Sequence, residues 1–170
     1  MSLIDDALSA NAALAEDHVP GPAGPPAPKI AVVTCADPRL SSVVRLMGIP
    51  DADVDLIRNV GTVIDEDAIR SLIISTRMLG TREIMIINHL DCGLTHFSGE
   101  DLEVRLRTET GKAPIVPTAF CTFTDVEANT REQMLKTRSH PWIAAEIPVR
   151  GFIFDERTGR LQEVLADAEA

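Results

Sequence analysis

Two apolar runs without polar alternation place the strongest constraint on the fold of this chain. They are residues 29–34 (KIAVVT) and 83–88 (EIMIIN). Each run has the length of one strand, and the lack of alternation indicates a strand that is buried on both faces. Strands of this kind occur in parallel sheets whose faces are covered by helices. The sequence therefore predicts an α/β fold.

Both runs end at residues that bind transition metals. Cys35 follows the first run, and His89 and Cys92 follow the second. Parallel strands finish at the same edge of a sheet, where ligands collect, so we expect these three side chains to converge. Two thiolates and one imidazole suit Zn²⁺. Three protein ligands leave a fourth position open, which is the pattern of a catalytic zinc site.

Three motifs resemble, in their order and spacing, the signature of the β-class carbonic anhydrases. They are CADPR at 35–39, RNVG at 58–61 and HLDCG at 89–93. The resemblance extends from about residue 29 to 155 and is closest to the short bacterial members. It implies a zinc enzyme that hydrates carbon dioxide reversibly to bicarbonate and a proton, by attack of a zinc-bound hydroxide.

The resemblance also assigns catalytic roles to Asp37 and Arg39. It implies that Arg39 holds the carboxylate of Asp37 away from zinc, where Asp37 accepts a hydrogen bond from the zinc-bound water. If Arg39 lets go, Asp37 becomes the fourth ligand and closes the site. Judged from the residues alone, the two would form an ordinary surface ion pair, which contributes little to stability.

Two other functions stay open on the sequence. Some relatives use the same zinc site to hydrolyse carbonyl sulfide or carbon disulfide, which are linear molecules like carbon dioxide. A missing glutamine favours this alternative: plant-type members carry one before the Arg-Asn motif, where this chain has Pro50, and its own glutamines are Gln133 and Gln162. The other alternative is a non-catalytic zinc-binding or redox-sensing domain with Cys121 as fourth ligand.

The N-terminal residues predict a helical arm on a single domain that spans residues 1–170. Residues 3–17 have the apolar spacing of a short amphipathic helix. Residues 20–28 hold five prolines and two glycines, which predict an extended linker, so the arm covers residues 1–28. In the family that the chain resembles, such helices embrace the neighbouring subunit. This implies a homodimer, or a tetramer made of two dimers.

The rest of the chain predicts a mainly parallel sheet with flanking helices and an antiparallel edge strand at the C-terminus. Further strands are expected at 54–57, 149–154 and 161–165. Helices are expected at 38–47, 63–79, 98–110 and 124–138. Gly80 is placed to end the helix 63–79, and Ser98 with Asp101 can cap the helix 98–110. Thr124 with Glu127 forms a capping-box pattern at the start of the last helix.

Charge and composition exclude several partners. The net charge is −10 and the isoelectric point about 4.8, which argues against nucleic acid or an anionic membrane. No apolar stretch reaches the roughly 20 residues that span a bilayer. The N-terminus lacks the basic region and long apolar core of a signal peptide, so we expect a cytoplasmic protein. Three cysteines fit reduced metal ligands better than a disulfide framework.

Overall fold

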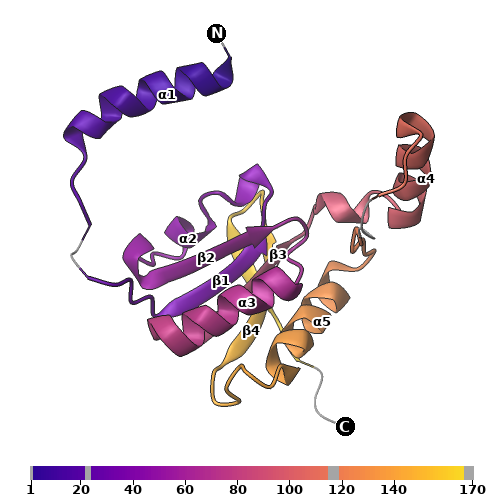
Figure 1. Cartoon of the computed structure of the whole chain (residues 1–170). Coiled ribbons are helices and arrows are strands. Elements are labelled where there is room, and N and C mark those ends of the chain that lie inside the picture. Colours follow the sequence, from indigo (N-terminus) through magenta and orange to yellow (C-terminus); the bar gives the residue numbers. More distant parts are fainter. Residues whose placement is uncertain (1, 22–23, 115–118, 167–170) are drawn as a thin grey trace.

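The centre of the protein is a five-stranded sheet of order β2-β1-β3-β4-β5 (Figure 1). The structure, a computed structural model, describes residues 2–21, 24–114 and 119–166. The strands are β1 (Ile30–Cys35), β2 (Val54–Asn59), β3 (Glu83–His89), β4 (Val149–Asp155) and β5 (Arg160–Val164). The first four are parallel, and β5 pairs antiparallel with β4. The predicted fold class is confirmed.

The two apolar runs form the inner strands β1 and β3. Residues 31–34 of β1 are 0% exposed, as the lack of polar alternation predicts. Thr34 pairs with Ile87 in the parallel register, so β1 and β3 finish at the same edge of the sheet. This edge is where the metal-binding residue types gather.

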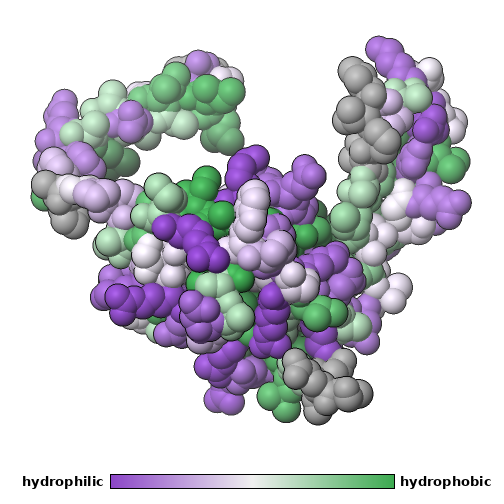
Figure 2. All heavy atoms as spheres, turned by 60° about the horizontal axis from the view of Figure 1, so that its bottom comes forward, coloured by the Kyte–Doolittle hydropathy of each residue, from purple (hydrophilic) through white to green (hydrophobic). Residues whose placement is uncertain are grey.

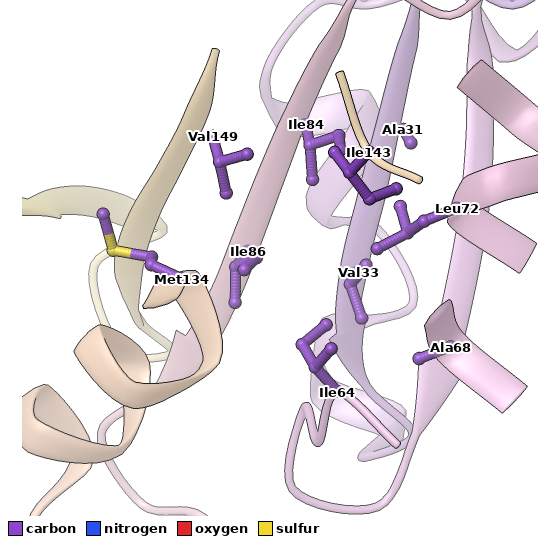
Figure 3. Packing of buried hydrophobic residues seen from close by; sticks show 10 residues of the cluster. All are labelled: Ala31, Val33, Ile64, Ala68, Leu72, Ile84, Ile86, Met134, Ile143 and Val149. Atoms are coloured by element: carbon purple, nitrogen blue, oxygen red, sulfur yellow. The ribbon is translucent and has the colours of Figure 1, made fainter. Parts of the chain in front are cut away.

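Helices α3 (Glu66–Ile74) and α5 (Val126–Ser139) cover one face of the sheet (Figure 1). Figure 3 shows side chains from both helices lying against those of β1, β3 and β4. The buried cluster consists of Ala31, Val33, Ile64, Ala68, Leu72, Ile84, Ile86, Met134, Ile143 and Val149. Helix α5 approaches β4 closely at Gly151, where an added Cβ would lie 2.3 Å from the Met134 sulfur.

The opposite face carries a 3₁₀ turn, η2 (Pro38–Leu40), and a short helix, α2 (Val43–Leu46). The prediction of one continuous helix over 38–47 is therefore wrong. The carboxylate of Asp37 accepts the Arg39 N–H, which favours a tight turn, and Ser42 has a non-helical ψ of 6°. The η2 turn carries Arg39, which contacts Asp91 beyond the end of β3.

The predicted helix 63–79 is also interrupted. Helix α3 begins only after Asp65, whose side chain caps its first turn. A π-helical turn, η4 (Ser75–Leu79), follows α3, and the Ser75 and Thr81 hydroxyls form a buried hydrogen bond of 2.8 Å beside it. Gly80 ends the segment with a φ of 92°, as predicted.

The last two helices differ in how well their starts were predicted. Helix α4 (Gly99–Thr110) is capped by Ser98, as expected. Helix α5 is capped by Asp125, whose carboxylate accepts two backbone N–H groups of the first turn. The predicted capping box at Thr124 is therefore wrong, because an aspartate one residue later caps the same helix.

Two helices stand away from the sheet in Figure 1: α1 (Leu3–Leu14) and α4. The structure describes every residue of both, and none is buried. Figure 2 shows apolar side chains along α1 at the upper left, and Leu3 and Ile4 are 84% and 72% exposed. The helix α1 exists as predicted, followed by a 3₁₀ turn, η1 (Ala15–Asp17), but it does not pack on its own domain. Residues 1 and 22–23 of the predicted arm lie outside the described residues. Within the described residues, no helix has the length and apolar character to cross a membrane.

Candidate metal centre

The structure brings Cys35, His89 and Cys92 together at the carboxyl edge of the sheet. Cys35 ends β1, His89 ends β3, and Cys92 precedes a 3₁₀ turn, η5 (Gly93–Thr95). One ligand atom from each residue lies within 4.8 Å of the other two, and all three residues are buried. This convergence follows from the parallel register of β1 and β3.

The three residues fit a zinc ion. The His89 Nε2 atom is buried and has no hydrogen-bond partner among the described residues. Buried polar atoms rarely lack a partner, so the atom points to a missing ligand. Two sulfur donors and one imidazole nitrogen are a donor set that zinc prefers. Because the cluster supplies three ligands, a bound zinc ion would keep one position for another molecule.

Glu156, which directly follows the neighbouring strand β4, orients the His89 ring. Its Oε1 atom lies 2.6 Å from His89 Nδ1 and accepts the Asp91 N–H at 3.2 Å. Burial opposes ionisation of Glu156, but hydrogen bonds from backbone N–H groups and from His89 keep its pKa below the usual value. A carboxylate only accepts hydrogen bonds, so the proton of neutral His89 lies on Nδ1 and Nε2 is free for the metal.

Sequence reasoning missed this role of Glu156, because residues 155–160 lie between two expected strands and look like an ordinary turn. The signal was present in the order of elements. Glu156 directly follows β4, and β4 runs parallel to β3 with Phe154 opposite His89. A residue just beyond β4 therefore reaches the same edge as the metal-binding cluster.

The Cys35 sulfur and the backbone around it are held by the second motif, RNVG at 58–61. The Gly61 N–H donates to Cys35 Sγ at 3.3 Å. Arg58 donates to the carbonyl oxygens of Cys35 and Asp37 at 3.0 and 2.7 Å. Gly61 has a φ of 84°, and an added Cβ would lie 2.3 Å from a Leu94 methyl group. The left-handed φ and this contact favour glycine at the end of the motif.

The two thiols of the cluster differ in acidity. A hydrogen bond from the Cys92 thiol, helped by the Gly61 N–H, lowers the pKa of Cys35 despite its burial. The same hydrogen bond and burial raise the pKa of Cys92. A metal that binds both sulfurs as thiolates must therefore displace the proton that Cys92 holds more tightly.

Asp37 and Arg39 form a two-point ion pair next to the cluster. Arg39 Nε lies 3.0 Å from Asp37 Oδ1, and Nη2 lies 2.8 Å from Oδ2. The other side of the guanidinium contacts Asp91, at 2.8 Å to both Oδ2 and the backbone oxygen. These contacts with Arg39 lower the pKa of Asp37 to about 2, so Asp37 is a carboxylate at neutral pH. The Asp91 carboxylate also accepts a hydrogen bond from His96 Nε2 at 2.9 Å.

Cys121 does not join the cluster. It is exposed, and its sulfur contacts the carbonyl oxygen of Ala119 at 3.7 Å. Among the described residues, the group that can hold a metal comprises Cys35, His89 and Cys92. The alternative of a closed site with three cysteines therefore finds no support in the geometry of the single chain.

Comparison with known proteins agrees with this site. A protein-family model described as "Carbonic anhydrase" matches residues 30–112. Beta-carbonic anhydrase 1 of Mycobacterium tuberculosis is 38% identical over 96% of this chain and 99% of its own length. A crystal structure of carbonic anhydrase from Streptococcus mutans superposes with a TM-score of 0.85 at 36% identity, over 97% of this chain and 99% of that one. A carbon disulfide hydrolase of Acidianus is 29% identical over 79% of this chain and 76% of its own length. On this evidence the chain belongs to the β-carbonic anhydrase family.

Proposed function

We propose that this protein catalyses the reversible hydration of carbon dioxide to bicarbonate and a proton. The observation that carries the proposal is the buried cluster of Cys35, His89 and Cys92 beside the Asp37–Arg39 ion pair. The cluster fits zinc with one position left open, as a catalytic site requires. Membership of the β-carbonic anhydrase family supports the reaction and the metal.

Each residue of the site has a distinct part in this proposal. Zinc, when bound, supplies the Lewis acidity that makes water a nucleophile at neutral pH. Cys35, His89 and Cys92 hold the metal. Asp37 accepts a hydrogen bond from the reacting water and so fixes its orientation. Arg39 holds Asp37 through two hydrogen bonds, which keeps the carboxylate from turning towards the metal and filling the open position.

A second candidate is the hydrolysis of carbon disulfide or carbonyl sulfide. The observation that favours it is the set of relatives named carbon disulfide hydrolase, which includes the proteins of Acidianus and Saccharolobus solfataricus at 29% and 27% identity. Both substrates are linear and electrophilic at carbon, like carbon dioxide, so the same five residues would serve. The mycobacterial relative has higher identity and wider coverage, which places carbon dioxide first.

One experiment separates the two candidates. Metal-analysed protein is mixed with carbon dioxide in a stopped-flow pH-indicator assay, and the same preparation is assayed for sulfide release from carbon disulfide and carbonyl sulfide. We expect rapid hydration of carbon dioxide and little sulfide. Rapid sulfide release without hydration would replace the first proposal by the second. A zinc-loaded protein inactive on all three substrates would contradict both.

We further propose that the protein is a homodimer, or a tetramer made of two dimers, in which α1 packs on the neighbouring subunit. The exposed apolar residues of α1 and its separation from its own domain support this arrangement. We also propose a cytoplasmic location. The three cysteines are free thiols, and a reducing compartment keeps Cys35 and Cys92 available for the metal.

A further inference from the structure

The loop of residues 60–65, between β2 and α3, has a conformation that its surroundings must maintain. Gly61 and Thr62 have φ values of 84° and 58°, both in the left-handed region. Glycine adopts this region freely, but a β-branched threonine does so at a cost in free energy. The same loop carries the Gly61 N–H that donates to Cys35 Sγ. The position of this hydrogen bond therefore depends on what holds the loop.

Two anchors of the loop come from the strands nearby. The Asn59 side chain binds both backbone groups of Val63, at 2.8 Å to its nitrogen and 2.6 Å to its oxygen. The Thr62 hydroxyl donates to the Ile87 carbonyl oxygen at 3.2 Å. These contacts fix the middle of the loop but leave the Ile64 N–H, at its far end, to find another acceptor.

The third anchor is Gln133 of helix α5, on the face of α5 that packs against the sheet. Its Oε1 atom accepts the Ile64 N–H at 2.9 Å, and the residue is 2% exposed. Its Nε2 atom donates to Asn129 Oδ1 at 2.9 Å, which fixes the amide with its oxygen towards the loop. The Asn129 Nδ2 atom, by contrast, is buried without a partner among the described residues.

We propose that Gln133 is a positioning residue of the metal centre. By accepting the Ile64 N–H it holds the loop 60–65 in place, and the loop keeps the Gly61 N–H on the Cys35 sulfur. A hydrogen bond to a ligating thiolate withdraws charge from sulfur and orients it, which sets how strongly the thiolate binds the metal. The inference rests on the proposed zinc site but not on the identity of the substrate.

The variant Gln133→Met tests this inference, since methionine matches glutamine in length but offers no comparable acceptor. The buried Ile64 N–H would then be unpaired, and the loop would shift to relieve it. We expect zinc affinity, measured by competition with a chromophoric chelator, to fall about tenfold, as for other outer-shell changes. We also expect the thiolate-to-metal charge-transfer band of the cobalt-substituted protein to move.

Thr137→Val is the matched control. Thr137 is 0% exposed on the same helix, and its hydroxyl bonds only the Gln133 carbonyl oxygen within α5 among the contacts that the structure describes. Valine keeps its shape, so zinc affinity and the cobalt spectrum should match the wild type. If Gln133→Met also matches the wild type in both readouts, even with a lower melting temperature, Gln133 only stabilises the fold and the proposal is wrong.

The variant Gln133→Glu tests whether the side chain acts as a hydrogen-bond acceptor or only through its packing. A carboxylate still accepts the Ile64 N–H, and a turned Asn129 amide can offer it the Nδ2 group that now lacks a partner. We expect this variant to bind zinc more tightly than Gln133→Met, and equal losses in the two would contradict the proposal. If Gln133→Met does not fold, Asn129→Ala loosens the Gln133 amide, and unchanged zinc affinity there would overturn the inference. Neither zinc affinity nor the cobalt spectrum is a reaction rate. An inactive wild-type protein would therefore contradict the proposed function and leave the inference about Gln133 standing.

Discussion

The carboxyl edge of the sheet and the two projecting helices, α1 and α4, differ in how far the chain itself buries their side chains. At the edge, Cys35, His89 and Cys92 are 4%, 0% and 1% exposed, and residues from other strands hold them. On α1 and α4, no residue is buried, although α1 alone exposes four large apolar side chains: Leu3, Ile4, Leu8 and Leu14.

This difference indicates that metal binding and the association of subunits depend on different parts of the chain. The three residues of the candidate metal centre and the residues that contact them come from one chain, because the parallel register of β1, β3 and β4 places them together. The apolar surface of α1 is a cost for an isolated chain, and a second subunit would remove it. Changes at the edge should therefore abolish metal binding without altering assembly, and changes on α1 should do the reverse.

The largest effect is expected at the edge. Cys92→Ser removes one of two sulfur ligands while it keeps the size of the side chain. We expect zinc to be lost and carbon dioxide hydration to fall by at least about 10⁴-fold, because the metal activates the water. Metal analysis and stopped-flow assays on the same sample measure both. Cys121→Ser, at an exposed cysteine outside the cluster, is the control and should keep zinc and rate.

The second effect is expected on α1. Removal of residues 1–19 deletes the exposed Leu3, Ile4, Leu8 and Leu14. If each buries most of its surface on a partner, at about 1.5 kcal/mol or more, dimerisation should weaken by about 10⁴-fold. Light scattering over a range of concentrations measures the dissociation constant, and metal analysis should still find stoichiometric zinc. A truncated chain that stays dimeric at nanomolar concentration would show that association does not use α1.

The third effect returns to the edge but leaves the metal in place. Asp37→Asn and Arg39→Ala should both retain zinc and lose about 10²-fold in rate, because the reacting water loses its oriented acceptor. The folded pKa of Asp37 is about 2, below its unfolded value, so this ion pair stabilises the protein at neutral pH and is lost only as the pH falls towards 2. Any change of rate near neutral pH must then come from another group. The Asp37→Asn variant should therefore keep the midpoint of the wild-type pH–rate profile. Full activity in both variants would refute the role of the pair.

The parts of this molecule that the sequence predicts are those whose pattern is local. Apolar runs of strand length predicted β1 and β3. The cysteines and the histidine that follow these runs predicted the metal-binding group. Ser98 and Gly80 were recognised as helix ends because their chemistry acts on adjacent backbone. The breaks at Ser42 and at the π turn after Ile74 were missed, since each depends on hydrogen bonds that a periodicity of apolar residues does not encode.

The supporting residues of the site were missed for a different reason. Glu156 and Gln133 lie 67 and 69 residues from their hydrogen-bond partners, His89 and Ile64. In sequence they look like a turn glutamate and a helix-surface glutamine. Their roles follow only from the strand order β1-β3-β4 and from the packing of α5 on the sheet, which the sequence predicts in outline and not in register.

The smallest effect is expected from an ion pair on α4, and it sharpens the comparison most directly. Arg107 of α4 and Arg39 at the edge have similar exposed fractions of their side chains, 50% and 44%. Arg107 contacts Glu103, one turn earlier in the same helix, whereas Arg39 also contacts Asp91, 52 residues away. Arg107→Ala should lower the free energy of unfolding by no more than about 0.5 kcal/mol, and salt should erase the difference. Urea denaturation at low and high salt measures this, and zinc content and rate should not change. A rate loss as large as that of Arg39→Ala would mean that α4 acts on the site, and the separation between edge and arms would fail. The expected contrast rests on how far apart in the chain the contacts of each arginine lie, since the two are almost equally exposed.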